Sequence, residues 1–146
     1  TIGTVGATTG INATGPVRIE TLSGDLTVAQ NIATTNTGAS ALILNAGKAT
    51  AAGTMTGGNL LLSGAPTLTI GSGGRATLYS GSISSSTGLT GLVGSGSGRF
   101  RYNSDESTTN YTLALGSGLH GIYRENPTVN VAVETNTMTY GIALPP

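Results

Sequence analysis

The sequence predicts an all-β protein, most simply a β-solenoid, with a β-sandwich as the alternative. Two observations predict it. Short runs in which apolar and polar residues alternate recur along the chain, and each is closed by Gly, Asn or Ser. No helix-length segment carries apolar residues at helical spacing free of Gly or strings of Thr.

The core must be narrow. The 146 residues include one Phe, five Tyr and no Trp, so Leu, Ile, Val and Ala would have to fill it. Gly and Pro make up roughly 20% of the chain, below the 25–30% that marks low-complexity disorder. A folded chain built of thin layers is therefore expected.

The alternating runs predict six strands in the first half of the chain, at 17–21, 25–29, 41–45, 59–63, 67–70 and 76–79. One coil of such strands cannot bury its own apolar face, so successive coils would stack about 4.8 Å apart. Gly24, Gly47, Gly64 and Gly81 would then lie at corners, where a left-handed backbone or close approach excludes a Cβ. The tight Asn-Gly and Asp-Gly turns of a hairpin sandwich are missing, which favours the solenoid.

The second half of the chain is less regular. Residues 82–98 are mostly Gly, Ser and Thr, which predicts a looser loop section. Two further strands are expected at 99–103 and 111–115 around a polar turn, and Ile122 and Tyr123 close the unit.

A change of pattern near Asn126 divides the chain into a solenoid region, 1–125, and a tail, 126–146. Val129, Val131 and Val133 alternate with more polar residues, which predicts one longer strand with a single apolar face. A further short strand is expected at 138–144 and would include Tyr140. Because about 20 residues cannot bury enough surface to fold alone, this tail is expected to dock on the same molecule, to pair with another copy as an assembly strand, or to be the start of a second β module.

Composition excludes several classes of partner. Charged residues make up 8% of the chain and balance to zero, so no nucleic acid is expected as a partner. Cysteine is absent, and no run approaches the 18 apolar residues of a membrane helix, so no disulfide framework and no membrane insertion are expected. Self-association, neighbouring modules of the same chain, or uncharged glycans and matrix surfaces suit such a surface better.

The pattern G-x-G-x-x-G at 116–121 is not expected to bind a nucleotide. A dinucleotide site needs a helix that opens at the third glycine, and Pro127 with the strand-like Ile122 and Tyr123 leaves no room for one. Asp105, Glu106 and His120 are the nearest approach to a catalytic cluster.

A solvated turn explains the two acids better, because neighbouring side chains of a strand point to opposite faces. We therefore expect no catalytic, cofactor-binding or metal-binding residue, and no enzyme.

One pair of arginines raises a binding hypothesis. Arg99 and Arg101 would share one face of a strand, with Phe100 and Tyr102 on the other. The ordinary assignment is aromatic side chains inward and arginines outward. Contact with a glycan by Arg99, Arg101 and Tyr102 is the sharper alternative.

Several segments resemble very large bacterial exoproteins of the filamentous-haemagglutinin type, in which haemagglutinin repeats form β-helical arrays that alternate with small MBG-type β modules. The matching segments, from about Gly15 onward, are 24–28, 44–47, 58–64, 96–106 and 121–127, and 139–141 is similar to the start of an MBG module. The resemblance implies secretion to the bacterial cell surface, a right-handed parallel β-helix and a role in adhesion or surface structure. It transfers no catalytic residues.

Together these observations predict a non-catalytic structural or adhesive segment of a secreted bacterial surface protein. The alternative is a subunit of an extracellular filament or sheath that assembles head to tail through solenoid ends and strand pairing by the tail. A carbohydrate-binding module is the third interpretation.

Overall fold

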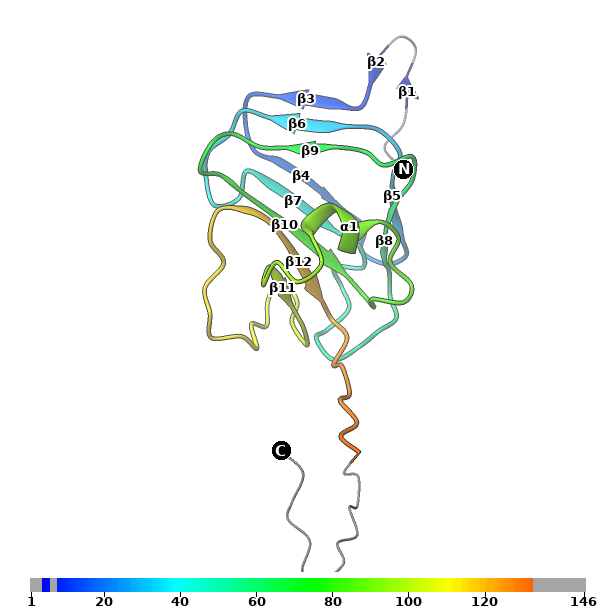
Figure 1. Cartoon of the computed structure of the whole chain (residues 1–146). Coiled ribbons are helices and arrows are strands. Elements are labelled where there is room, and N and C mark those ends of the chain that lie inside the picture. Colours follow the sequence, from blue (N-terminus) through cyan, green and yellow to red (C-terminus); the bar gives the residue numbers. More distant parts are fainter. Residues whose placement is uncertain (1–3, 6–7, 133–146) are drawn as a thin grey trace, which may run out of the picture.

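The computed structural model describes residues 4–5 and 8–132, which form short parallel strands and one helix (Figure 1). The strands are β1 (Thr4–Val5), β2 (Thr8–Thr9), β3 (Ile11–Ala13), β4 (Val17–Glu20), β5 (Leu26–Val28), β6 (Ile32–Thr34), β7 (Leu42–Asn45), β8 (Leu60–Leu62), β9 (Leu68–Thr69), β10 (Arg75–Ser80), β11 (Phe100–Arg101) and β12 (Gly118–Tyr123). Helix α1 spans Leu89–Val93.

Strand pairing repeats in chain order. Strands β3, β4 and β5 pair in parallel with β6, β7 and β8 respectively. Strands β9 and β10 then pair with β6 and β7, and an isolated parallel bridge joins Leu61 of β8 to Thr87. Figure 1 shows the first of these sheets as β3, β6 and β9 lying one below another.

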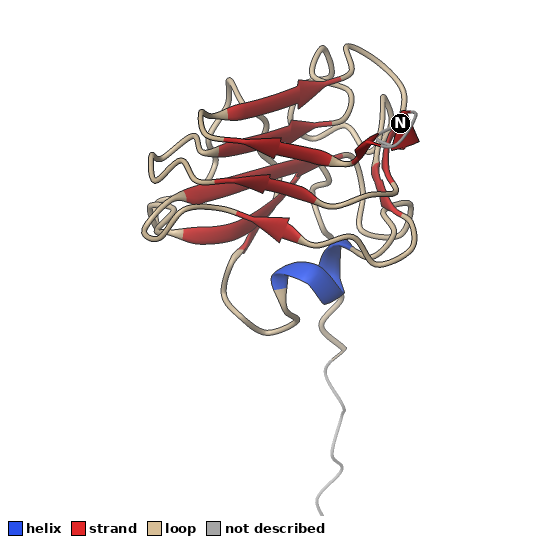
Figure 2. Ribbon diagram, turned by 90° about the horizontal axis from the view of Figure 1, so that it is seen from above, coloured by secondary structure: helices blue, strands red, loops and turns tan. Residues whose placement is uncertain are grey.

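The parallel pairing argues against one of the two predicted all-β architectures. Only β1 and β2 pair antiparallel among the described strands. Parallel neighbours cannot be joined by two-residue hairpins. A hairpin-built β-sandwich is therefore excluded for the part of the chain from β3 to β12, and the parallel sheets that run side by side in Figure 2 replace it.

Parallel register also builds the core. Leu42 and Leu44 of β7 lie opposite Val17 and Ile19 of β4, and the same register continues into β10. Because register partners point to the same face, apolar side chains align in columns across neighbouring strands. Leu42 and Leu44 are buried. The inward-facing apolar residues of β5, β8 and β10 are buried with them, as the narrow core of Leu, Ile, Val and Ala requires.

The predicted corner glycines take two forms. Gly24, Gly47 and Gly64 have the left-handed backbone that was expected, with φ of 82°, 75° and 74°. Gly81 lacks a positive φ, but a Cβ there would collide with the backbone oxygen of Met55. The reason in that case is close packing between chain segments and not backbone conformation.

All six strands predicted in the first half are present within one or two residues of the expected bounds. The strand predicted at 111–115 is wrong, because this segment contains two bends and no strand. Its backbone oxygens accept from side chains: Leu115 O from Arg75 Nη1 at 3.0 Å, and Leu113 O from Arg101 Nη2 at 3.4 Å. The section predicted as loop, 82–98, contains α1, whose Leu89 and Val93 are buried.

The tail strand predicted over 129–134 is not formed in its described part, 129–132. Val129 and Val131 are 80% and 82% exposed, so the alternating pattern has no apolar surface to pack on. Among the described residues, the last backbone hydrogen bonds involve Glu125. Its N–H donates to Gly81 O, and its O accepts from Asn103 N. Val133 and Tyr140 lie outside the described residues, and the division near Asn126 stays a prediction.

Candidate binding site

Three aromatic rings gather where the five-stranded sheet ends at its edge strand, β11. Phe100 begins this strand and Tyr102 follows its last residue, Arg101, so alternation along the extended chain puts the two rings on one side. Strand β11 pairs in parallel with β12, with Phe100 opposite Gly121 and Arg101 opposite Ile122. The next pair in this register brings Tyr102 beside Tyr123.

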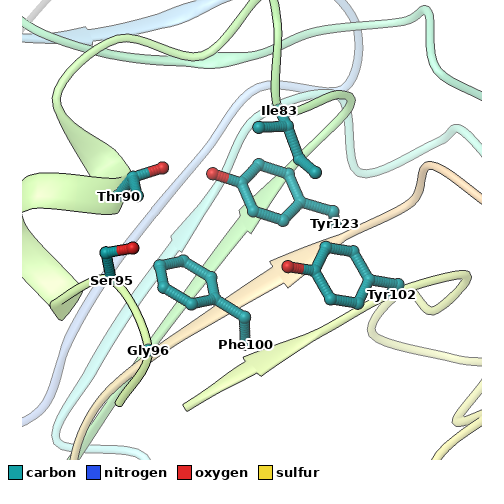
Figure 3. Close-up of a pocket in the computed structure, with 7 residues that line it drawn as sticks. All are labelled: Ile83, Thr90, Ser95, Gly96, Phe100, Tyr102 and Tyr123. Atoms are coloured by element: carbon teal, nitrogen blue, oxygen red, sulfur yellow. The ribbon is translucent and has the colours of Figure 1, made fainter. Parts of the chain in front are cut away.

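The rings are stacked. Tyr123 lies 5.9 Å from Phe100 and 5.8 Å from Tyr102 between ring centroids, with interplanar angles of 18° and 11°. Figure 3 shows Phe100 and Tyr102 side by side, with Tyr123 across them. Tyr123 is 1% exposed, while Tyr102 is 37% exposed, so the stack begins in the core and ends at the surface. Such offset stacking is a favoured arrangement for aromatic pairs.

Gly121 makes room for this arrangement. A Cβ at Gly121 would lie 2.6 Å from Cε1 and 2.7 Å from Cδ1 of Phe100, well inside van der Waals contact. The Phe100 ring therefore occupies the space that a side chain at residue 121 would fill. A glycine in mid-strand often marks such a close approach.

The rings form one wall of a pocket of about 130 Å³. The other wall comes from the helix α1 region and the turns on either side of it, through Ile83, Thr90, Ser95 and Gly96. No lining residue is charged, and the polar side-chain groups are hydroxyls. The pocket thus combines aromatic faces with neutral hydrogen-bonding groups.

The hydroxyl of Tyr123 is the unusual group in this pocket. It is buried, and none of the described residues makes a hydrogen bond of acceptable geometry to it. Burial raises the pKa of Tyr123, and the nearby hydroxyls of Thr90 and Ser86 oppose part of the rise. Thr90 and Ser86 lie close enough to interact with this hydroxyl but do not complete a hydrogen bond of good geometry, so the hydroxyl can accept a better partner that enters the pocket.

The predicted glycan contact is only partly assembled. Tyr102 lines the pocket, but Arg101 lies on the opposite face of β11. Its guanidinium donates to the backbone oxygens of Gly98 and Phe100, both at 2.8 Å, and lies 5.4 Å from the ring centroid of Tyr111. Arg99 is exposed and is not part of the pocket lining. Tyr102 is more exposed than the half-buried Arg101, so the expected arrangement of inward aromatics and outward arginines is only partly seen, and glycan contact by Arg99, Arg101 and Tyr102 stays a prediction.

The acids and the histidine of the sequence analysis do not converge. Asp105 closes a turn by accepting from Ser107 N and Thr108 N, and also accepts from Ala52 N at 2.7 Å. His120 is buried in β12 with Nε2 3.1 Å from Gly116 O, and burial is the main cause that lowers its pKa.

Glu106 is more than a solvated turn residue. Its side chain bonds Arg18 and accepts from Asn45 Nδ2 at 3.1 Å, which ties the loop between β11 and β12 to the outer face of β4 and β7. Glu20 lies beside the same arginine and 2.7 Å from Lys48 Nζ. Burial alone would raise the pKa of Glu20, but the hydrogen bonds and charges of Lys48 and Arg18 outweigh it and lower the pKa. These carboxylates are engaged in holding a loop on the sheet.

The sequence analysis missed Arg124, the largest fully buried side chain among the described residues, at 1% exposed. Its Nη1 donates to Ala46 O at 2.7 Å and its Nη2 to Gly58 O at 2.5 Å. Burial lowers its pKa, and Asp105 partly offsets this. The side chain joins the end of β12 to the loop between β7 and β8, which is a structural role.

The glycine pattern at 116–121 has no nucleotide geometry, because Gly118 and Gly121 lie within β12 and no helix follows them in the described chain. Within residues 4–5 and 8–132, no group of three or more His, Cys, Asp and Glu side chains could hold a metal ion. No helix there is long and apolar enough to cross a membrane.

A second pocket, about 420 Å³, lies beside the first turn of α1. It is lined by Leu62, Ala65, Pro66, Thr67, Gly88, Gly91 and Leu92. Thr67 supplies its only polar side chain, so it offers little chemistry for orienting a ligand.

Comparison of the sequence and structure with protein-family models, curated proteins and solved structures found no match. The class that the geometry supports is an all-β protein of parallel sheets with an aromatic pocket at one sheet edge.

Proposed function

We propose that the chain is a non-catalytic β-solenoid segment, with the right-handed parallel β-helix of filamentous-haemagglutinin-type exoproteins, that serves adhesion or surface structure on a bacterium. The observation that carries this is the pairing of strand triplets in chain order, β3-β4-β5 with β6-β7-β8. A chain that winds in stacked coils produces such pairing. The resemblance to these exoproteins supplies the cellular setting.

Adhesion by such a segment depends on a long rigid surface and not on a reaction. The acids and His120 are separately engaged in hydrogen bonds that hold loops and strands together. A solenoid presents its loops and edges along one axis, which suits contact with an extended polymer. The surface is poor in charge, which suits neutral polymers.

The test is an adhesion assay on the full chain. Beads that carry the chain should attach to surfaces coated with neutral polysaccharide or extracellular matrix, more than beads that carry serum albumin. No reducing ends should be released from the polysaccharide. Failure to attach to any coating, or release of reducing ends, would contradict the proposal.

A second candidate is a subunit of an extracellular filament. It is favoured by the exposure of Val129 and Val131 on a segment that leaves the body after β12 (Figure 1). Strands β4 and β11 end the five-stranded sheet and leave an edge on each side. An added strand from another copy would satisfy such an edge.

A further inference from the structure

The structure assigns a binding site for a neutral pyranose sugar to the pocket formed by Phe100, Tyr102 and Tyr123 with Thr90 and Ser95. This inference deepens the adhesive part of the proposed function and rests on it for its biological setting. It identifies a ligand class and a set of residues different from the arginine pair that the sequence suggested.

The aromatic wall is the first support. Phe100 lies on β11, the last strand of its sheet, and Tyr102 directly follows that strand, so no further strand of the described chain covers them on that side. Tyr123 lies behind both rings and fixes them by stacking. A rigid pair of aromatic rings offers a flat apolar surface, which matches the C–H face of a pyranose.

The hydroxyl groups are the second support. Tyr123 Oη is buried without a hydrogen-bond partner among the described residues, and Thr90 and Ser95 bring two more hydroxyls to the same pocket. Each of these hydroxyls can both donate and accept a hydrogen bond, and so can each hydroxyl of a sugar. An apolar occupant, such as a valine side chain from another copy, would leave these groups without partners.

The absence of charged lining residues and the size of the pocket narrow the class of ligand further. No charged side chain lines the pocket, so nothing there would recognise a carboxylate or sulfate on an acidic sugar. The volume of about 130 Å³ is far below the roughly 300–1,000 Å³ of pockets that enclose a drug-sized ligand. The pocket therefore suits one sugar unit, at the end or along the edge of a glycan.

The chain provides a specific reporter for this site. It contains one phenylalanine, so in a sample labelled with ¹³C-phenylalanine every aromatic phenylalanine NMR signal comes from Phe100. We would titrate the full chain with neutral tetrasaccharides of glucose, mannose, galactose and N-acetylglucosamine. Tetragalacturonate serves as the acidic counterpart.

The inference predicts that at least one neutral tetrasaccharide shifts the Phe100 signals in a saturable way. Tyr102→Ala should weaken binding about tenfold or more by removing the exposed ring. Tyr123→Phe keeps the ring and loses only the hydroxyl, and should weaken binding about three- to tenfold. Tyr111→Ala, which removes a tyrosine that packs against Arg101 and not in the pocket, should leave affinity unchanged.

Three results would overturn the inference: no shift with any neutral tetrasaccharide at millimolar concentration, a response to tetragalacturonate alone, or neutral binding that both Tyr102→Ala and Tyr123→Phe leave intact. Shifts that depend on protein concentration without sugar would assign the face to self-association instead. Circular dichroism confirms that each variant is folded. A negative sugar titration would not change the result expected from the adhesion assay, so the two proposals are tested separately.

Discussion

At the scale of single residues, Gly121 determines whether the aromatic stack can form. Its missing side chain lets the ring of Phe100 approach the backbone of β12, and that position brings the ring against Tyr123. Arg124 acts nearby in a different way, by tying the end of β12 to both ends of the loop between β7 and β8 through backbone oxygens. The sequence offers no pattern for either role, because both depend on neighbours far away in the chain.

Gly121→Ala is expected to destabilise the protein by about 1–3 kcal/mol, the usual cost of overpacking, because the new methyl group must displace the Phe100 ring. Chemical denaturation followed by circular dichroism measures this change. Gly116→Ala is the matched control, since nothing lies within 4 Å of a Cβ there. Equal stability of the two variants would show that the ring position does not depend on Gly121.

The candidate site could be predicted only in part. Alternation predicted that Phe100 and Tyr102 share one face, and both rings line the pocket while Arg99 and Arg101 do not. Tyr123 could not be identified as their partner, because the register of β11 with β12 crosses a loop of 16 residues from 102 to 117. The contribution of Thr90 and Ser95 was equally hidden, since it depends on α1.

At the scale of elements, the strands with clear alternation and a glycine boundary were predictable, and the others were not. Strand β6, Ile32–Thr34, was missed because the following Thr and Asn residues give its short run no clear end. The segment 111–115 has strand-like composition, yet it covers the outer face of the sheet. β-Propensity alone does not distinguish a strand from a loop that packs against a sheet.

The tail is the element that the filament proposal concerns. If residues from 126 onward pair with an open edge, the full chain should form fibres in negative-stain images, with light scattering that rises with concentration. Replacing the exposed Val129 and Val131 by Ser should weaken the fibres strongly. Replacing Thr128 and Asn130 by Ser is the control, because their side chains would point to the other face.

Deletion from Asn126 onward should abolish the fibres altogether. A full chain that stays monomeric at every concentration, with stability unchanged by the deletion, would contradict strand pairing by the tail.

At the scale of the whole molecule, the central claim is that the chain winds in stacked coils. The narrow core, the left-handed corner glycines and the parallel register all agree with it. Composition predicted the thin layers, but the in-order pairing of triplets needed the structure, because an irregular spacing of strands does not fix which strand lies beside which.

Cysteine cross-linking of this cysteine-free chain tests the claim most directly. Thr27 of β5 and Leu61 of β8 are register partners and would lie on adjacent coils of the proposed solenoid, so Thr27→Cys with Leu61→Cys should form an intramolecular disulfide and raise the free energy of unfolding by about 3 to 4 kcal/mol. Thr27→Cys with Ser63→Cys is the control. Ser63 lies two residues beyond the register partner of Thr27, so the two Cα atoms are about 8 Å apart, beyond the reach of a disulfide. Selective cross-linking of the first pair on a non-reducing gel is the predicted result. No cross-link, or equal cross-linking of both pairs, would contradict the stacked coils.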